Sequence, residues 1–180
     1  VTLETIDHKH PLAASIVDTM LDWKLDWLDK RGLVGGVVRS NGFRAFVKGL
    51  MEPPTYQTSN PVCFALLQNN KPMASFLCMP DNDILHCYFT AFEPEKAEHS
   101  PGLILIHKII DWMSATPLRY YDFEGFPEPY KDKLATNKVE LFDVMVPLSI
   151  KGRLAVTAKK IPSRKIIKTL FYKLPKGLRS

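Results

Sequence analysis

Residues 84–113, ILHCYFTAFEPEKAEHSPGLILIHKIIDWM, decide which fold this chain adopts. The first nine residues are rich in apolar, aromatic and sulfur-bearing side chains, which predicts a strand over 84–92. Ser100 followed by Pro101 is typical of a helix start, because serine caps the first turn and proline lacks only an N–H that is unpaired there anyway. The helix predicted to run on to Met113 is apolar on nearly every side, so it is expected to pack against a sheet.

The rest of the chain supplies neighbours for this strand and helix. Two further strands are predicted before residue 84, joined by turns rich in Asn and Asp, so that the three strands form an antiparallel meander. The other expected elements are helices at 11–31 and 42–51, strands at 62–67, 73–79, 120–123 and 139–146, and a helical turn at 129–134. This order predicts an α+β domain with helices on a mostly antiparallel sheet.

Charge is unevenly distributed along the 180 residues, whose net charge is +5. Residues 151–180 contain ten of the 24 lysines and arginines and no acid, which leaves 14 bases against 19 acids in the preceding 150 residues. The sequence therefore predicts a mildly acidic domain at 1–150 and a basic C-terminal extension at 151–180. The net positive charge of the chain therefore comes from this extension, and no basic groove is predicted in the domain.

The cysteine count and the hydropathy of the sequence predict the cellular compartment of the protein. The chain has three cysteines, an odd number in a chain large enough to build a core, which argues against a disulfide framework and predicts a reducing, cytoplasmic environment. No run of about 18 apolar residues is present, so no membrane-spanning helix is expected. The charged first residues predict no signal peptide, and Val1 in place of Met suggests a piece of a longer protein.

Several kinds of site are disfavoured by the motifs. The cysteines lie in predicted strands without a C-x-x-C pair, so no metal site is expected. Neither the G-x-S-x-G pattern of hydrolases nor the G-x-x-x-x-G-K-S/T pattern of nucleotide hydrolases occurs.

The helix start at Ser100 is a candidate anion site. Unpaired backbone N–H groups and the positive end of the helix dipole favour a phosphate there, and Gly102 lets a ligand approach the backbone closely. An ordinary capped helix explains the same residues equally well.

A second candidate site lies at 120–131, YYDFEGFPEPYK. Acids beside phenols, such as Asp122 and Glu124 beside Tyr130, are suited to holding an amine and moving its proton. A solvated turn with two buried aromatic side chains is the alternative.

These two stretches together resemble a known family. His99–Leu105, followed after a helix by Tyr121–Gly125 and Glu128–Lys131, is similar to the C-terminal acyltransferase domain of bacterial GNAT-superfamily proteins. The subgroup is the CelD-like one associated with cellulose biosynthesis, which is related to FemAB-type transferases. The pattern K-x-x-W-L-x-x-x-G of an upstream helix is matched as well, by Lys24, Trp27, Leu28 and Gly32. The resemblance covers about residues 11–150.

The resemblance implies a GNAT-like fold, with a splayed, mixed, mostly antiparallel central sheet flanked by helices and acyl-CoA in the splay. It implies a transferase that moves an acyl group to an amine or hydroxyl of a small-molecule or envelope-related, glycan-precursor acceptor. Donor-binding residues by analogy are Thr90, Ala91 and Phe92 for the pantetheine and His99, Ser100, Gly102 and Leu103 for the pyrophosphate. By the same analogy Tyr130 protonates the leaving thiolate, and Glu124 or Asp122 accepts the proton of the attacking amine.

Two other readings of the function stay open. The family usually has Q/R-x-x-G-x-G/A at the pyrophosphate turn, whereas this chain has Ala97-Glu98-His99-Ser100-Pro101-Gly102. FemAB-like relatives lack the motif too, so an aminoacyl transferase using aminoacyl-tRNA is the first alternative. A non-catalytic GNAT-like module that docks a partner is the second.

The basic extension can be read in three ways. Apolar residues interleave with its lysines and arginines, which predicts an amphipathic helix at about 163–173. Such a helix can lie on an anionic membrane surface, which implies a peripheral position at the inner face of the membrane. It can also contact the phosphates of tRNA or coenzyme A, or pack its apolar side on the acidic domain. Nucleic acid is not expected as a partner unless aminoacyl-tRNA is the donor.

Overall fold

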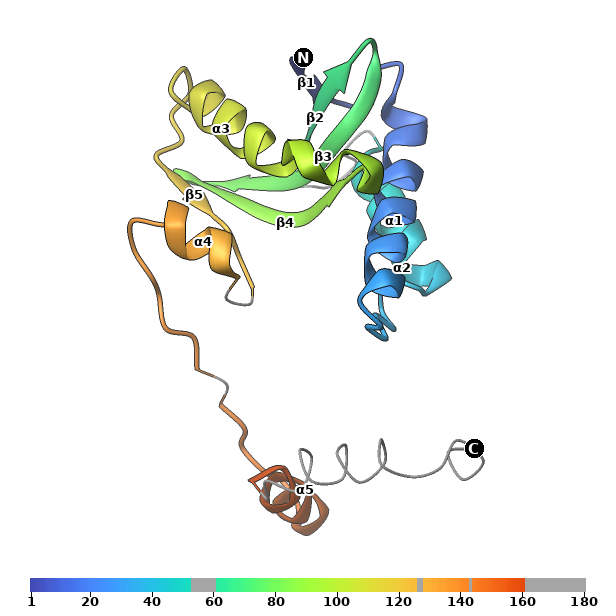
Figure 1. Cartoon of the computed structure of the whole chain (residues 1–180). Coiled ribbons are helices and arrows are strands. Elements are labelled where there is room, and N and C mark those ends of the chain that lie inside the picture. The colour runs from blue at the N-terminus through green and yellow to red at the C-terminus, as the bar shows by residue number, and fades with distance from the viewer. Residues whose placement is uncertain (53–60, 126–127, 143, 161–180) are drawn as a thin grey trace. The chain divides into compact units, whose positions relative to one another are not determined.

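The computed structural model describes residues 1–52, 61–125, 128–142 and 144–160 (Figure 1). The chain forms two compact units, Val1–Lys133 and Leu134–Ser180. The predicted division at residue 150 stays a prediction about domain organisation.

The first unit contains a five-stranded mixed sheet (Figure 1). Its strands are β1 (Thr2–Ile6), β2 (Val62–Gln68), β3 (Lys71–Asp81), β4 (Ile84–Phe92) and β5 (Tyr120–Asp122), in that spatial order. Neighbouring strands are antiparallel except β4 and β5, which run parallel. The predicted meander is confirmed, and the sheet has an additional strand, β1, that sequence reasoning missed. The sequence of β1, TLETI, has two aliphatic side chains, Leu3 and Ile6, three residues apart, so it lacks the alternation of apolar residues that predicts a strand.

The turns of the meander depend on asparagine. Asn69 and Asn70 both have positive φ, 53° and 61°, between β2 and β3. Two left-handed residues match the twist of the flanking strands in a two-residue hairpin, and asparagine tolerates that conformation better than most residues. Asn82, with φ 53°, serves the turn between β3 and β4.

The helices follow local signals closely. Their bounds are α1 (Ala13–Lys30), α2 (Asn41–Leu50), the 3₁₀ helix η1 (Pro94–His99), α3 (Pro101–Met113), α4 (Pro129–Leu134) and α5 (Ile150–Lys160). Helix α1 ends where predicted: Gly32 adopts φ 63°, and the N–H of Leu33 donates to the carbonyl of Leu28 at 2.9 Å. At the start of α2, the hydroxyl of Ser40 accepts a hydrogen bond from the N–H of Phe43 at 3.1 Å, as expected of an N-cap.

One helix start differs from the expectation. Ser100 stands at the N-cap of α3 as predicted, but its side chain makes no capping hydrogen bond. The residue joins η1 directly to α3 in the left-handed conformation, with φ 48° and ψ 50°, whereas a capping serine has an extended backbone. Its carbonyl instead accepts from the N–H groups of Leu103 and Ile104.

Helices cover both faces of the sheet. Successive strand residues point to opposite faces, so Cys63 and Ala65 share one face and Phe64 faces the other. The face with Cys63 and Ala65 forms a core with buried residues of α1 and α2. On the opposite face, the ring of Phe64 lies 4.8 Å from that of Trp112 in α3, edge to face. The predicted packing of α3 against the sheet is thereby confirmed.

The second unit lacks, in its described residues, the strand that the sequence predicts at 139–146. The strand expected at 139–146 is wrong for 139–142 and 144–146, which adopt no regular structure. The alternating apolar side chains are present, but Val139 and Leu141 are each 84% exposed. A strand is completed by hydrogen bonds to a neighbouring strand, and within the described residues none pairs with this segment. The helix predicted at 163–173 lies outside the described residues. In the part of the chain that the structure describes, no helix combines the length and apolar character needed to cross a membrane.

Candidate active site

Strand β4 is the element around which the site is built. It pairs with β5 only through its first three residues, Ile84–His86, opposite Tyr120–Asp122. Beyond His86, β4 continues to Phe92, and no described strand pairs with that edge. The sheet therefore opens into a fork, with unpaired backbone groups on one prong.

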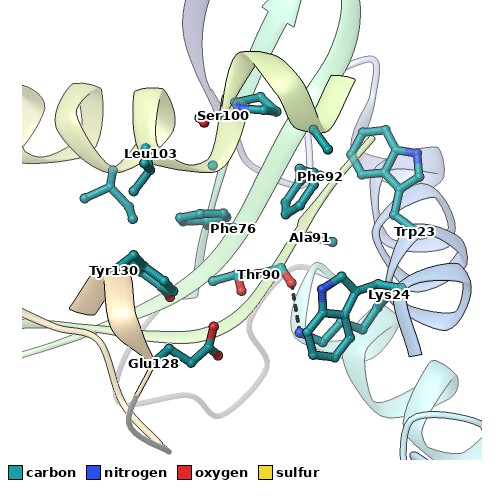
Figure 2. Close-up of a pocket in the computed structure, with 15 residues that line it drawn as sticks. Trp23, Lys24, Phe76, Thr90, Ala91, Phe92, Ser100, Leu103, Glu128 and Tyr130 are labelled. Carbon is teal, nitrogen blue, oxygen red and sulfur yellow. Dashed lines mark hydrogen bonds between the residues drawn. The ribbon is translucent and has the colours of Figure 1, made fainter. Parts of the chain in front are cut away.

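A cavity of about 270 Å³ lies beside the unpaired half of β4 (Figure 2). Helix α1, strands β3 and β4, the junction of η1 with α3, and the start of α4 all contribute to its wall. Its lining includes Trp23, Lys24, Trp27, Phe76, Thr90, Ala91, Phe92, Ser100, Gly102, Leu103, Glu128 and Tyr130.

Most of the residues singled out from the sequence meet at this cavity. The set that lines it comprises Thr90, Ala91, Phe92, Ser100, Gly102, Leu103 and Tyr130. Three others do not line it: Asp122 and Glu124 lie at the base of the fork, and His99 is exposed beside Glu98, 3.5 Å away. The roles assigned to all ten residues stay predictions.

Gly102 leaves space on the cavity wall. A Cβ at this position would lie 3.7 Å from Phe92 and 3.8 Å from Phe76, which are ordinary contacts. Alanine therefore fits at residue 102, whereas a long side chain there has to enter the cavity or displace these rings.

Tyr130 is half-buried, and its ring lies 6.3 Å from that of Phe123. Burial, with smaller contributions from Glu128 and Cys87, raises the pKa of Tyr130 to about 12. The phenol consequently keeps its proton throughout the neutral range and can act as a hydrogen-bond donor.

A histidine and two carboxylates meet at the base of the fork. His86 Nδ1 lies 2.8 Å from Glu124 Oε1 and 3.4 Å from Asp122 Oδ2. Glu124 has a left-handed backbone, with φ 52°; its N–H donates to Asp122 Oδ1, and its carbonyl accepts from Lys131. These bonds hold the Glu124 backbone in place and set its carboxylate against the His86 imidazole. Sequence reasoning missed His86, because its approach depends on the parallel register of β4 with β5.

The same three side chains are the group of described residues whose spacing could suit a metal ion, with ligand atoms within 4.8 Å of one another. The Glu124–His86 hydrogen bond accounts for the cluster without an ion. The expectation of no metal site stays a prediction.

Lys24 is a further cavity residue that sequence reasoning did not assign to the site. Its Nζ donates to the carbonyl of Thr90 at 3.3 Å and lies 4.7 Å from the centroid of the Trp27 ring. Trp23, Lys24 and Trp27 share a helix face because residues three and four apart are neighbours on a helix. The family motif quoted above contains Lys24 and Trp27, and that motif was the available signal.

Residues 3–132 match the family described as "Acetyltransferase (GNAT) domain". This match spans more than half of the chain, which therefore belongs to that family and to the acyltransferase class of enzymes. Members of this family take acetyl-CoA or another acyl-CoA as donor. No curated protein matches the sequence significantly.

Solved structures have the same fold at low sequence identity. An aminoglycoside acetyltransferase from an uncultured soil metagenomic sample is similar with a TM-score of 0.54 at 14% identity, covering 82% of this chain and 98% of its own. A second enzyme of that description, in complex with sisomicin, gives 0.53 at 10% identity, covering 81% and 95%. A possible acetyltransferase from Clostridium difficile 630 gives 0.56 at 10% identity, covering 81% and 100%. The GNAT-like α+β fold expected from the sequence is thereby confirmed.

Proposed function

We propose that the chain transfers an acyl group from acyl-CoA to an amine or hydroxyl of a small-molecule or glycan-precursor acceptor. The observation that carries this proposal is the fork: an unpaired edge of β4 borders a cavity that also contains Tyr130. The CelD-like subtype belongs to the same proposal and rests on the sequence motifs alone.

The cavity suits a long, mostly extended donor with an anionic end. The open edge of the Thr90–Phe92 segment offers backbone groups for the amides of pantetheine, as an additional strand would use them. The Thr90 carbonyl, which accepts a hydrogen bond from Lys24, is one of these groups. Gly102, in the first turn of the 13-residue helix α3, lies where backbone N–H groups and the helix dipole favour phosphate. When bound, acyl-CoA supplies an activated thioester.

The protein's own groups account for the proton movements. Glu124, held by His86, takes the proton that the acceptor nitrogen loses as its bond to the acyl carbon forms. Tyr130 donates its O–H to the sulfur as the carbon–sulfur bond breaks, so that coenzyme A leaves as a thiol. A proton passed through solvent from Glu124 to Tyr130 restores the starting state. Holding donor and acceptor together contributes the larger part of the rate increase.

The acceptor is proposed to be small, polar and amine-bearing. Asp122 and Glu124 lie at the fork, and Glu128 lines the cavity, so carboxylates surround the approach to the open edge. Negative charge attracts cationic amines. The soil-sample enzyme of similar fold was determined in complex with sisomicin and with trehalose, which supports acceptors of this size for this chain.

A melting experiment tests the donor. A ligand that binds only the folded state raises the melting temperature, by a larger amount the further its concentration exceeds Kd. We expect acetyl-, succinyl- or long-chain acyl-CoA to raise the Tm, and aminoacyl-tRNA to leave it unchanged. Stabilisation by aminoacyl-tRNA alone would favour the FemAB-like alternative.

A pair of substitutions at Gly102 locates the donor site. We expect Gly102→Glu to abolish calorimetric binding of acetyl-CoA, because it adds bulk and negative charge in the first turn of α3, where the phosphates would bind. Gly102→Ala is the matched control and should bind within about threefold of the parent, because its Cβ meets only ordinary contacts. Unchanged affinity in the glutamate variant would place the donor elsewhere.

A further inference from the structure

Lys24 brings a positive charge to the cavity wall without forming an ion pair there. The residue lies on α1, is half-buried, and lines the cavity that also contains Tyr130 (Figure 2). An ammonium group has three N–H donors, and one of them is used, by the carbonyl of Thr90 at 3.3 Å. Among the described residues, no carboxylate forms an ion pair with it.

The surroundings of the ammonium are aromatic. Its Nζ lies 4.7 Å from the centroid of the Trp27 ring and 5.7 Å from that of Phe89. Burial lowers the pKa of Lys24 from its ordinary value, while the carboxylate of Glu128 acts in the opposite direction. A cation partly withdrawn from water needs further hydrogen-bond acceptors, and a bound ligand can supply them.

The hydrogen bond to Thr90 shows which part of a ligand Lys24 meets. Thr90 belongs to the unpaired half of β4, which under the proposed function holds the donor next to its thioester. In Figure 2 Thr90 appears between Lys24 and Tyr130, so the cavity has a cation on one side and the phenol on the other. An acyl group placed there can turn its sulfur toward Tyr130 and its carbonyl oxygen toward Lys24.

We infer that the Lys24 ammonium donates a hydrogen bond to the acyl carbonyl oxygen of the bound donor. This inference rests on the proposed function and adds a catalytic residue to it. As the acceptor nitrogen adds to the acyl carbon, negative charge collects on that oxygen until the carbon–sulfur bond breaks. A cation already in place beside aromatic rings and partly withdrawn from water stabilises this charge more strongly than it would in bulk solvent.

Calorimetry with acetyl-CoA and free coenzyme A separates this role from a structural one, because only acetyl-CoA has the carbonyl. We expect Lys24→Met to weaken binding of acetyl-CoA about tenfold, the cost of a hydrogen bond to a charged group, and to change coenzyme A binding less than about twofold. We expect kcat to fall about 10²–10³-fold, as for the loss of one group that stabilises developing negative charge. Lys24→Arg, which keeps the charge with a different shape, should recover part of the acetyl-CoA affinity.

Arg31→Met is the matched control. Arg31 is the C-cap residue directly after α1, with its guanidinium carbon 4.3 Å from the centroid of the same Trp27 ring, and it does not line the cavity. We expect this variant to retain both affinities within about twofold, since only a cation on the indole is removed.

The outcomes distinguish this inference from the proposed function. A parent protein that binds neither ligand contradicts the proposed function itself. A parent that binds both, with Lys24→Met losing both equally or neither, overturns the role of Lys24 alone. Acetylation of Lys24 by acetyl-CoA, detected by mass spectrometry, also overturns it, because the nitrogen would then act as a nucleophile.

Discussion

At the scale of single residues, Tyr130 is suited to act as a proton donor, because its phenol stays protonated throughout the neutral range. Burial, Glu128 and Cys87 raise its pKa to about 12. An acid this weak is most effective while negative charge is forming on the sulfur beside it, so its contribution belongs to the transition state.

We therefore expect Tyr130→Phe to lower kcat about 10²–10³-fold with little change in KM, within the range of acid–base catalysis. Because a raised pKa keeps the phenol protonated until pH approaches about 12, the ratio of parent to variant kcat should stay constant from about pH 7 to 10. Steady-state rates measured across that range check both points. A kcat within twofold of the parent would remove Tyr130 from the mechanism.

At the scale of elements, α1 holds three of the cavity residues, and its attachment to α2 contributes to their position. Asp18 on α1 pairs with Arg44 and, at 2.7 Å, with Lys48, both on α2. Arg44 also reaches Asp22, 3.0 Å away. These charged contacts join the two helices at the surface, above the apolar core that they share.

Replacing Asp18 with Asn should lower the Tm by about 1–3 °C at pH 7, because exposed ion pairs contribute about 0.2–1 kcal/mol. The Lys48 ammonium, together with Arg44, holds the pKa of Asp18 below its ordinary value of 3.8. The contribution is therefore present above that value and lost as the pH falls through the lower, folded-state pKa. Melting curves should differ most at neutral pH and converge in strong acid.

Asp26→Asn is the control for this experiment. It breaks the Asp26–Lys30 pair, 2.8 Å, which lies within α1 and does not join two elements. If Asp26→Asn lowers the Tm as much as Asp18→Asn does, the loss of stability comes from removing a charge on α1 and not from breaking the α1–α2 contact.

At the scale of the whole molecule, the basic extension at 151–180 has two proposed partners, an anionic membrane surface and the phosphates of a nucleic acid, and these two can be told apart. Residues 151–180 carry ten bases and no acid. Attachment to a membrane surface needs both this charge and apolar side chains, whereas binding of phosphate chains needs the charge alone.

We expect the full chain to sediment with vesicles containing anionic lipid, because each lysine or arginine near such a surface contributes about 1 kcal/mol. Ile167→Ser with Phe171→Ser should reduce sedimentation, since it removes apolar side chains and leaves the charge unchanged. Retention of tRNA is expected to stay low in both forms. A parent that fails to sediment, or binds tRNA tightly and in a salt-sensitive way, would contradict peripheral membrane attachment.

The sequence by itself determined the elements whose signals are local. Ser40, Gly32 and the asparagine turns act through hydrogen bonds or backbone angles within a few residues, so α1, α2 and the β2–β4 meander could be predicted. The cavity residues could be nominated as well, because Gly102 and Tyr130 lie in the stretches that resemble the family, and Thr90–Phe92 follow by analogy from the fold that the resemblance implies.

Only the tertiary structure decided which distant residues meet. Lys24 contacts Thr90 across 66 residues, and His86 contacts Glu124 across 38, through helix packing and a parallel register that no short pattern encodes. The same reason explains both strand errors: β1 is a strand because β2 pairs with it, and 139–142 with 144–146 is not one because no described strand does. A strand's hydrogen bonds are made to another strand, whereas a helix makes its own.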